Sequence, residues 1–135
     1  MIIVRAQRVL LLIFMVALQG CAAFSSLPAE ERVAQRSQER LDLMWSGEMK
    51  ASYDYTTPGY RSARTWTEYK AKWLGVGMWK EAEVHRVDCG DLEPPSRCEA
   101  TIRVVFVAPR QAAATTYLKE QWLLVDGDWY LYQKL

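Results

Sequence analysis

The feature that most limits the fold of this chain is a change of hydrophobic period near Met78. Before this point apolar residues recur three and four positions apart, as in amphipathic helices. After it apolar and polar residues alternate, as in strands that bury one face. Helices followed by consecutive strands predict an α+β fold, in which the helices bury an apolar stripe against one face of an antiparallel sheet.

The first predicted helix begins near Pro28 and ends at about residue 46. Glu30 and Glu31 suit its N-terminus because the helix dipole favours acids there. Gly47 can end it in a left-handed conformation. The residues expected on its inner face are Val33, Ser37, Leu41, Met44 and Trp45.

Two shorter helices are expected before residue 78. One spans residues 48–55, and the chain turns at Pro58 because the residue before a proline avoids helical angles. The other is opened by a capping box, in which Thr65 bonds forward to the Glu68 amide and Glu68 bonds back. Over about nine residues this helix places three rings on one face, those of Trp66, Tyr69 and Trp73.

Four strands are expected in the second part of the chain, at about residues 79–88, 98–107, 116–125 and 129–134. Asp126-Gly127 predicts a tight hairpin turn between the last two. The sequence therefore predicts N-terminal helices packed on a curved antiparallel four-stranded meander, with a cone-like shape.

The N-terminus has the organisation of an export signal. Arg5 and Arg8 give it a positive start, residues 9–18 are all apolar, and the first acid is Glu30. The apolar run is shorter than the roughly 20 residues that cross a bilayer as a helix. A permanent transmembrane segment is therefore the weaker interpretation.

The order Leu18-Gln19-Gly20-Cys21 resembles the lipobox of bacterial lipoproteins, which are cut before a cysteine that carries diacylglycerol. The resemblance implies a signal peptide over residues 1–20, a lipidated tether over 21–27 that starts at Cys21, and one domain over 28–135. Because Ala22 rather than aspartate follows the cysteine, it also implies the periplasmic face of the outer membrane. The alternative is an ordinary signal peptide cut near Ala22-Ala23, with Cys21 discarded.

Composition limits the partners of the mature chain. Removal of residues 1–20 leaves 115 residues, enough for one domain. It also leaves 15 basic against 16 acidic side chains, so there is no basic surface for nucleic acid. We find no phosphate loop, nucleophile elbow or zinc motif, and we expect neither a metal nor a cofactor.

Two cysteines remain once Cys21 is assigned to lipid. Cys89 and Cys98 flank a turn-forming segment between two alternating stretches, in a compartment where disulfides persist. We expect them to be joined at the mouth of a hairpin. A metal site would need further thiols or imidazoles, and only His85 is near in the sequence.

The order of motifs from residue 28 to 135 is similar to the nuclear transport factor 2-like superfamily, also called the cystatin-like cone fold. The similarity rests on the long helix, on Gly47-Glu48-Met49, on Pro58-Gly59-Tyr60-Arg61, and on strands that end in Glu120-Gln121-Trp122 and Asp126-Gly127-Asp128-Trp129-Tyr130. It implies a cavity beneath the concave sheet face. Its members include both enzymes and binding domains, so the fold alone does not assign an activity.

Strict alternation would place Glu83 and His85 on the inner face of the first strand, together with Trp79, Glu81 and Val87. These two residues are then the candidate acid and base of a cavity, although a lone strand histidine is more often structural. The residues expected to line the cavity are Trp45, Tyr53, Trp66, Trp73, His85, Phe106, Glu120 and Trp122. On the third strand, the Glu120 carboxylate is expected to bond an indole or a helix amide.

Residues 102–107 are apolar on both faces of the second strand. Val84, Val105 and Val107 are therefore expected to meet a second subunit or a partner protein on the outer sheet face. The leading hypothesis is a lipid-anchored, noncatalytic binding or accessory domain for a protein or a small apolar ligand. The competing one is a small isomerase, hydratase or cyclase that uses His85 and a carboxylate.

Overall fold

A computed structural model describes residues 27–135 of the chain. The predicted leader of residues 1–20 and nearly all of the predicted tether, Cys21 included, lie outside these residues. The helices are α2 (Ala29–Trp45), α3 (Met49–Tyr53), α4 (Pro58–Ala63), α5 (Trp66–Lys72) and the 3₁₀ helix η2 (Leu74–Met78). The strands are β1 (Trp79–Asp88), β2 (Arg97–Phe106), β3 (Ala114–Val125) and β4 (Asp128–Leu131).

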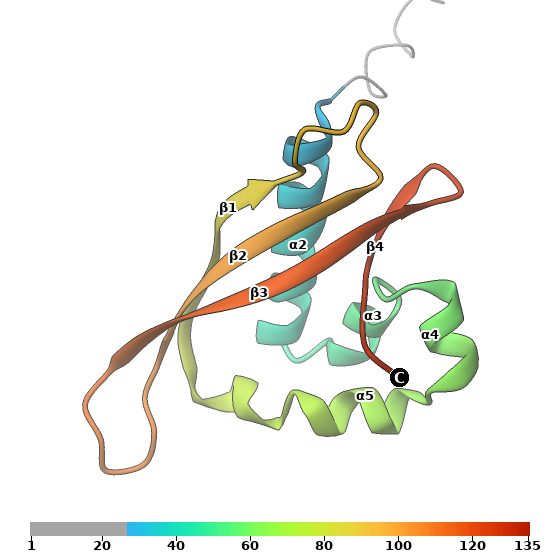
Figure 1. The fold of residues 1–135 in the computed structure, drawn as a ribbon. Coiled ribbons are helices and arrows are strands. Elements are labelled where there is room, and N and C mark those ends of the chain that lie inside the picture. The colour runs from blue at the N-terminus through green and yellow to red at the C-terminus, as the bar shows by residue number, and fades with distance from the viewer. Residues whose placement is uncertain (1–26) are drawn as a thin grey trace, which may run out of the picture.

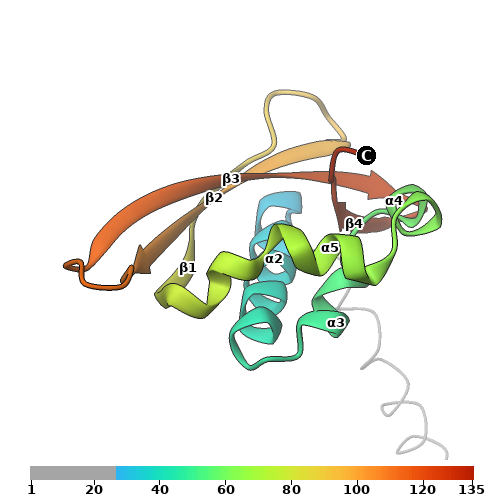
Figure 2. The ribbon, with the colours of Figure 1, turned by 90° about the horizontal axis from the view of Figure 1, so that it is seen from below.

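The four strands form one antiparallel sheet in the order β1-β2-β3-β4 (Figure 1). The sheet curls into a half-barrel, and the helices lie together under its concave face, as the view from below shows (Figure 2). The predicted α+β architecture, with N-terminal helices on a curved four-stranded meander, is confirmed.

Three local sequence motifs form the helix end, the helix cap and the turn that were predicted for them. Gly47 follows α2 with a φ of 86°, which only glycine adopts without strain. Thr65 accepts a hydrogen bond from the Glu68 amide at 3.3 Å, and the Glu68 carboxylate accepts one from the Thr65 amide at 2.7 Å, so the capping box is formed. Asp126 and Gly127 both have positive φ angles, as a tight turn of this hairpin type requires.

Helix α4 was not predicted, since Pro58 was interpreted only as the end of the preceding helix. In the structure Pro58 opens α4, and Thr57 caps it by accepting a hydrogen bond from the Tyr60 amide at 3.2 Å. Proline suits the first position of a helix because its missing N–H would have no partner there. The same residue thus ends one helical segment and begins the next.

Strand β1 departs from the predicted alternation. Its pairing with β2 shifts register between Trp79 and Glu81 and again between Val84 and Arg86. These irregularities turn Val84 toward the core and leave Glu83 and His85 exposed on the outer face. The predictions that placed Glu83 and His85 inside, and Val84 outside, are wrong for this reason.

The core lies between α2 and the concave sheet face. It contains Val33 and Leu41 from α2 and the alternate residues Ala100, Ile102 and Val104 of β2. Strands β3 and β4 add large side chains, Trp122, Trp129 and Leu131. These groups fill the space beneath the sheet that a cone-shaped cavity would occupy.

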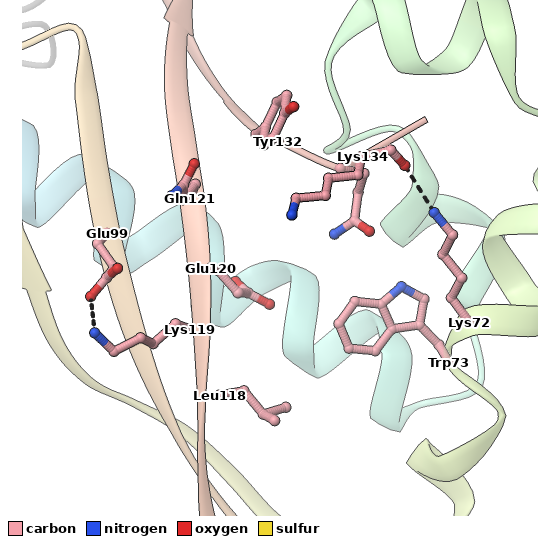
Figure 3. Close-up of a pocket in the computed structure, with 10 residues that line it drawn as sticks. Lys72, Trp73, Glu99, Leu118, Lys119, Glu120, Gln121, Tyr132 and Lys134 are labelled. Carbon is pink, nitrogen blue, oxygen red and sulfur yellow. Dashed lines mark hydrogen bonds and ion pairs between the residues drawn. The ribbon is translucent and has the colours of Figure 1, made fainter.

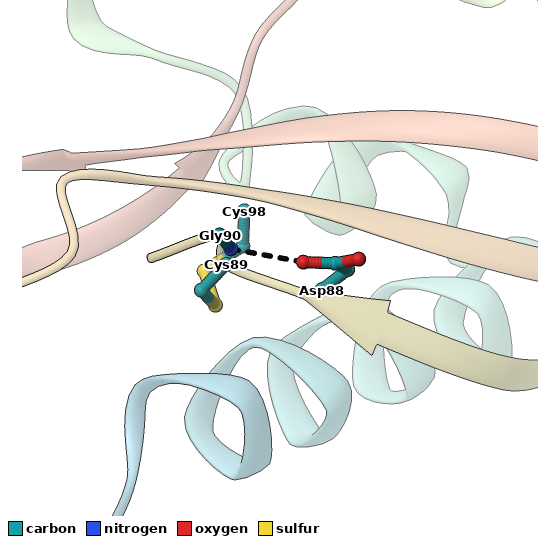
Figure 4. The surroundings of a disulfide bond; sticks show 4 residues. All are labelled: Asp88, Cys89, Gly90 and Cys98. Atoms are coloured by element: carbon teal, nitrogen blue, oxygen red, sulfur yellow. Dashed lines mark hydrogen bonds between the residues drawn. A yellow bond between two sulfur atoms is a disulfide. The ribbon is translucent and has the colours of Figure 1, made fainter. Parts of the chain in front are cut away.

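A disulfide joins Cys89 and Cys98 at the mouth of the β1–β2 hairpin (Figure 4). The two residues are nine positions apart, and their Cα atoms lie 3.9 Å from each other. Beside them the Gly90 amide donates a hydrogen bond of 2.9 Å to the Asp88 carboxylate. The predicted staple is confirmed.

Candidate binding site

A buried ion pair joins the helical layer to the sheet. The Arg40 guanidinium, from α2, contacts the Glu120 carboxylate, from β3, and their side chains are 0% and 4% exposed. The second oxygen of Glu120 accepts hydrogen bonds from the Ser37 hydroxyl at 3.0 Å and from the Trp122 indole at 3.3 Å. The sequence predicted an indole or a helix amide as the partner of Glu120, and the structure shows the indole. Both oxygens of this carboxylate are therefore occupied by donors of the protein.

Arg40 is held on several sides. Its Nε donates to the Tyr69 hydroxyl at 3.2 Å, and its guanidinium carbon lies 4.5 Å from the centroid of a Trp73 ring. Burial by itself disfavours the charged form, but attraction to Glu120 and the bonds to Tyr69 and Glu120 outweigh it and raise the pKa of Arg40. Its Nη2 atom is buried and has no hydrogen-bond partner among the described residues.

A groove of about 610 Å³ lies directly beside this ion pair (Figure 3). One wall is the middle of β3, and the other is formed by the end of α5 and the C-terminal residues. The residues that line it are Lys72, Trp73, Glu99, Leu118, Lys119, Glu120, Gln121, Tyr132, Gln133 and Lys134. It combines apolar surface with polar groups, as small-ligand and peptide sites commonly do.

The groove carries an excess of hydrogen-bond donors. The Trp73 indole N–H is buried and has no acceptor within residues 27–135. The Lys72 ammonium donates to the Lys134 carbonyl at 3.0 Å, and in the described chain neither lysine pairs with a carboxylate. The Lys119 ammonium is paired with Glu99 at 2.7 Å. The open positions of the groove thus suit an acceptor or an anion.

Some of the residues that the sequence predicts as the lining of a cavity lie at this groove. Trp73 and Glu120 line the groove, and Trp122 lies beneath it, fully buried and bonded to Glu120. Three other predicted residues do not line the groove, and these are Tyr53, Trp66 and Phe106. The Tyr53 hydroxyl donates to the Arg64 carbonyl at 2.6 Å, the Trp66 ring lies 6.4 Å from that of Tyr69, and Phe106 packs against the core.

Two predicted lining residues lie elsewhere. Trp45 is 49% exposed at the end of α2, because the helix turns its final residue away from the sheet. His85 lies on the outer face, where its ring meets that of Tyr117 with centroids 5.4 Å apart. Glu83 on the same face binds Arg103 at 3.2 Å. The predicted cavity placement of His85 and Glu83 is therefore wrong.

Arg40 is the residue that sequence reasoning missed. It lies three positions after Ser37 and seven after Val33, so helical spacing places it on the buried face of α2. A charged residue inside an apolar stripe signals a buried partner. The sequence could not identify that partner, because Glu120 is 80 positions away.

The structure contains no cluster of three or more potential metal ligands among the residues that it describes. Within the same residues no helix is both long and apolar enough to cross a bilayer. The outer sheet face, where a partner was expected, carries the ion pairs of Arg103 with Glu81 and Glu83. That partner stays a prediction.

Comparisons with known proteins place the chain by fold alone. No protein-family model matches it, and no curated protein matches its sequence. It is similar to the solution structure of RPA3114, a SEC-C motif containing protein from Rhodopseudomonas palustris, with a TM-score of 0.54 over 73% of each chain. The two sequences are 15% identical, so the similarity concerns the α+β architecture with its curled antiparallel sheet.

Proposed function

We propose that this chain is a lipid-anchored, noncatalytic binding domain of the bacterial envelope. Cys21 attaches it to the periplasmic face of the outer membrane, and the groove beside β3 holds its ligand. The observation that carries the binding role is the groove of about 610 Å³, which has Trp73 in its wall and the ammonium groups of Lys72 and Lys134 without a carboxylate partner among the described residues. A ligand site commonly combines apolar surface with a few charged groups in this way.

The state of Glu120 supports a noncatalytic role. A general acid or base must exchange a proton with a substrate, and its oxygen must be free to reach one. Both Glu120 oxygens already accept hydrogen bonds, from Arg40, Ser37 and Trp122. The other two candidates, His85 and Glu83, are exposed on the outer face of β1 and do not line the groove.

The proposal also includes the two family assignments, to bacterial lipoproteins and to the nuclear transport factor 2-like superfamily. The lipobox over residues 18–21 supports the anchor, and the order of helices and strands supports a place in the nuclear transport factor 2-like superfamily. A single acyl chain binds a membrane only marginally, whereas several chains hold a protein stably. The lipoprotein class, with its multiple acyl chains, therefore accounts for an anchor without a membrane-spanning helix.

The anchor can be tested by metabolic labelling with alkynyl palmitate in a Gram-negative host. The wild-type chain should incorporate the label and sediment with washed membranes, and Cys21→Ala should lose both properties. The variant with Cys89→Ala and Cys98→Ala is the matched control and should remain labelled. Membrane retention of Cys21→Ala without label would contradict a lipid anchor.

The groove can be tested with 1-anilinonaphthalene-8-sulfonate, which combines apolar rings with an anion. The probe should bind the native chain and shift the resonance of the Trp73 indole N–H. Trp73→Ala should abolish this binding, while Trp45→Ala, which removes an exposed indole outside the groove, should not. Binding that survives Trp73→Ala in a folded variant would show that the groove is not the site.

A further inference from the structure

The edge of β3 is unpaired over most of its length. Strand β3 has 12 residues, whereas β4 has four and pairs only with the segment from Trp122 to Val125. Beyond this segment the chain leaves the sheet and crosses to α5, where Lys72 binds the Lys134 carbonyl. Figure 1 shows β3 continuing past the C-terminus with no element beside it on this side. Residues 114–120 therefore border the place that a longer β4 would fill.

Hydrogen bonds at the C-terminal end of β3 establish which of its backbone groups point away from β2, toward the unpaired edge, which we call the open side. The Leu124 amide donates to the Ser96 carbonyl on the β2 side, and the Gln121 carbonyl accepts from the Tyr132 amide on the β4 side. Because the direction alternates along an antiparallel strand, the amides and carbonyls of Thr115, Tyr117 and Lys119 face the open side. No hydrogen bond from the described chain reaches them there.

The other sheet edges are covered in part. On β1 the Gln38 side-chain amide donates to the Ala82 carbonyl at 3.3 Å and accepts from the Val84 amide at 3.0 Å. On β4 the Leu131 amide donates to the Tyr55 carbonyl at 2.7 Å. Proteins commonly protect their edges with charged residues, a proline, a bulge or a covering segment. The open part of β3 has the charged Lys119, but no proline, no bulge against β2 and no covering segment among the described residues.

The open edge is also one wall of the groove. Leu118, Lys119 and Glu120 line it from β3, and the ammonium groups of Lys72 and Lys134 lie across from them. Lys119 and Glu120 are neutralised by Glu99 and Arg40, so the charge left in the groove is the positive charge of the two opposite lysines. A segment that occupies this place meets free backbone groups on one side and positive charge on the other.

We propose that the ligand of this groove is an extended, acidic peptide segment of a partner protein, which pairs as an added strand with β3 at Thr115, Tyr117 and Lys119. Its acidic side chains lie toward Lys72 and Lys134, and the segment packs against Trp73 in the groove wall. This inference rests on the groove being the binding site. Strand addition of this kind gives affinity through the main chain and selectivity through the side chains.

The test uses the full-length chain in detergent micelles and a synthetic peptide of alternating threonine and valine with aspartates at both ends. On saturation, hydrogen exchange at the Tyr117 and Lys119 amides should slow by about fivefold or more, as expected for one new hydrogen bond each. The matched peptides are one with lysines at both ends and one with methylated backbone amides. Both should bind at least about fivefold more weakly.

Two variants at one position separate backbone pairing from side-chain contact. Tyr117→Pro removes the N–H from the open edge and should weaken peptide binding by about fivefold or more. Tyr117→Ala keeps the N–H and loses only the side-chain ring on the outer face, so it should bind the peptide more tightly than Tyr117→Pro does. Equal affinities of the two variants, both folded by near-ultraviolet circular dichroism, would overturn strand addition.

Charge preference is the second readout. Lys134→Glu should reverse the preference between the acidic and basic peptides, and Lys50→Glu, an exposed change on α3 outside the groove, should leave it intact. If the anilinonaphthalene probe binds while the peptide gives no edge protection, strand addition is wrong and the binding groove stands. If neither ligand perturbs Trp73, the proposed function fails as well.

Discussion

At the scale of single residues, the unusual feature of this chain is an ion pair of an arginine and a glutamate inside the core. Arg40 and Glu120 are almost completely buried, where aliphatic side chains would cost nothing in desolvation. Either charge would destabilise the folded state if it were buried without the other. The pair therefore penalises any packing in which α2 slides or rotates on the sheet, since either movement separates the two charges.

Glu120→Gln should lower the free energy of unfolding by about 3–5 kcal/mol, because it leaves the Arg40 charge buried without its counter-ion. Urea denaturation would measure the loss. Glu99→Gln is the matched control, since its ion pair with Lys119 is exposed and should contribute less than about 1 kcal/mol. Replacing both Arg40 and Glu120 by methionine should restore most of the stability, and equal losses from Glu120→Gln and Glu99→Gln would contradict this account.

The capping box gives a prediction about pH. Hydrogen bonds from the Thr65 amide and hydroxyl, and then from Arg64, hold the pKa of Glu68 below its ordinary value. A carboxyl whose pKa is lower in the folded state stabilises the fold above its unfolded pKa, and this contribution is lost as pH falls through the folded pKa. Thr65→Ala should therefore raise the pKa of Glu68 and reduce the pH dependence of stability in the acid range.

Carboxyl titration by nuclear magnetic resonance would measure this pKa in both proteins. Thr67→Ala provides the control, since Thr67 lies in the same turn and makes no bond to Glu68 in the structure. A Glu68 pKa that is unchanged by Thr65→Ala would show that the hydroxyl of the cap has no part in the shift.

At the scale of elements, one side chain of α2 completes an edge of the sheet. The Gln38 side-chain amide has a donor and an acceptor in the spacing that a neighbouring strand would supply. It donates to the Ala82 carbonyl and accepts from the Val84 amide of β1. The helix thereby covers the edge of β1 and fixes its own position along the strand. The open part of β3 lacks such a cover.

Gln38→Ala should destabilise the fold by about 1 kcal/mol and speed hydrogen exchange at the Val84 amide. Gln35→Ala removes a glutamine of the same helix whose amide bonds only the exposed Glu39, and it should cost no more than about 0.5 kcal/mol. Exchange measured by nuclear magnetic resonance would separate the two. Unchanged protection of Val84 in Gln38→Ala would mean that the side chain does not cover the edge.

At the scale of the whole molecule, helices and sheet share one core. Val33 and Leu41 from α2 lie in the same cluster as Trp122, Trp129 and Leu131 from the sheet. The rings of Tyr53, Tyr60 and Tyr69 form a smaller cluster within the helical layer, and the Tyr69 hydroxyl connects it to Arg40 of α2. A domain of this size whose helices and sheet are joined in this way is expected to unfold in a single cooperative step.

Far-ultraviolet circular dichroism, which follows the helices, and tryptophan fluorescence, which reports Trp122 and Trp129 among others, should therefore give coincident urea transitions. The same midpoint should appear in the Cys21→Ala chain, since the described core is built from residues 29–131. Separate midpoints for the two signals would contradict a shared core.

The sequence by itself determined the order of the elements apart from α4, the end of α2 at Gly47, the capping box, the final hairpin turn and the Cys89–Cys98 pair. Each depends on residues a few positions apart, whose steric preferences and hydrogen bonds act within one turn or one hairpin. Trp73 and the Glu120–Trp122 bond could be predicted from the sequence for the same reason, because helical or strand spacing places neighbouring residues on one face.

Only the tertiary structure decided which face of β1 is buried, which partner Arg40 has, and where the groove lies. Register shifts against β2 turned Glu83 and His85 outward, and such shifts depend on how the sheet curls over α2. The Arg40–Glu120 contact spans 80 positions, and the groove needs β3, α5 and the C-terminal residues together. Local preference cannot specify these features, because their energies arise only when distant segments meet.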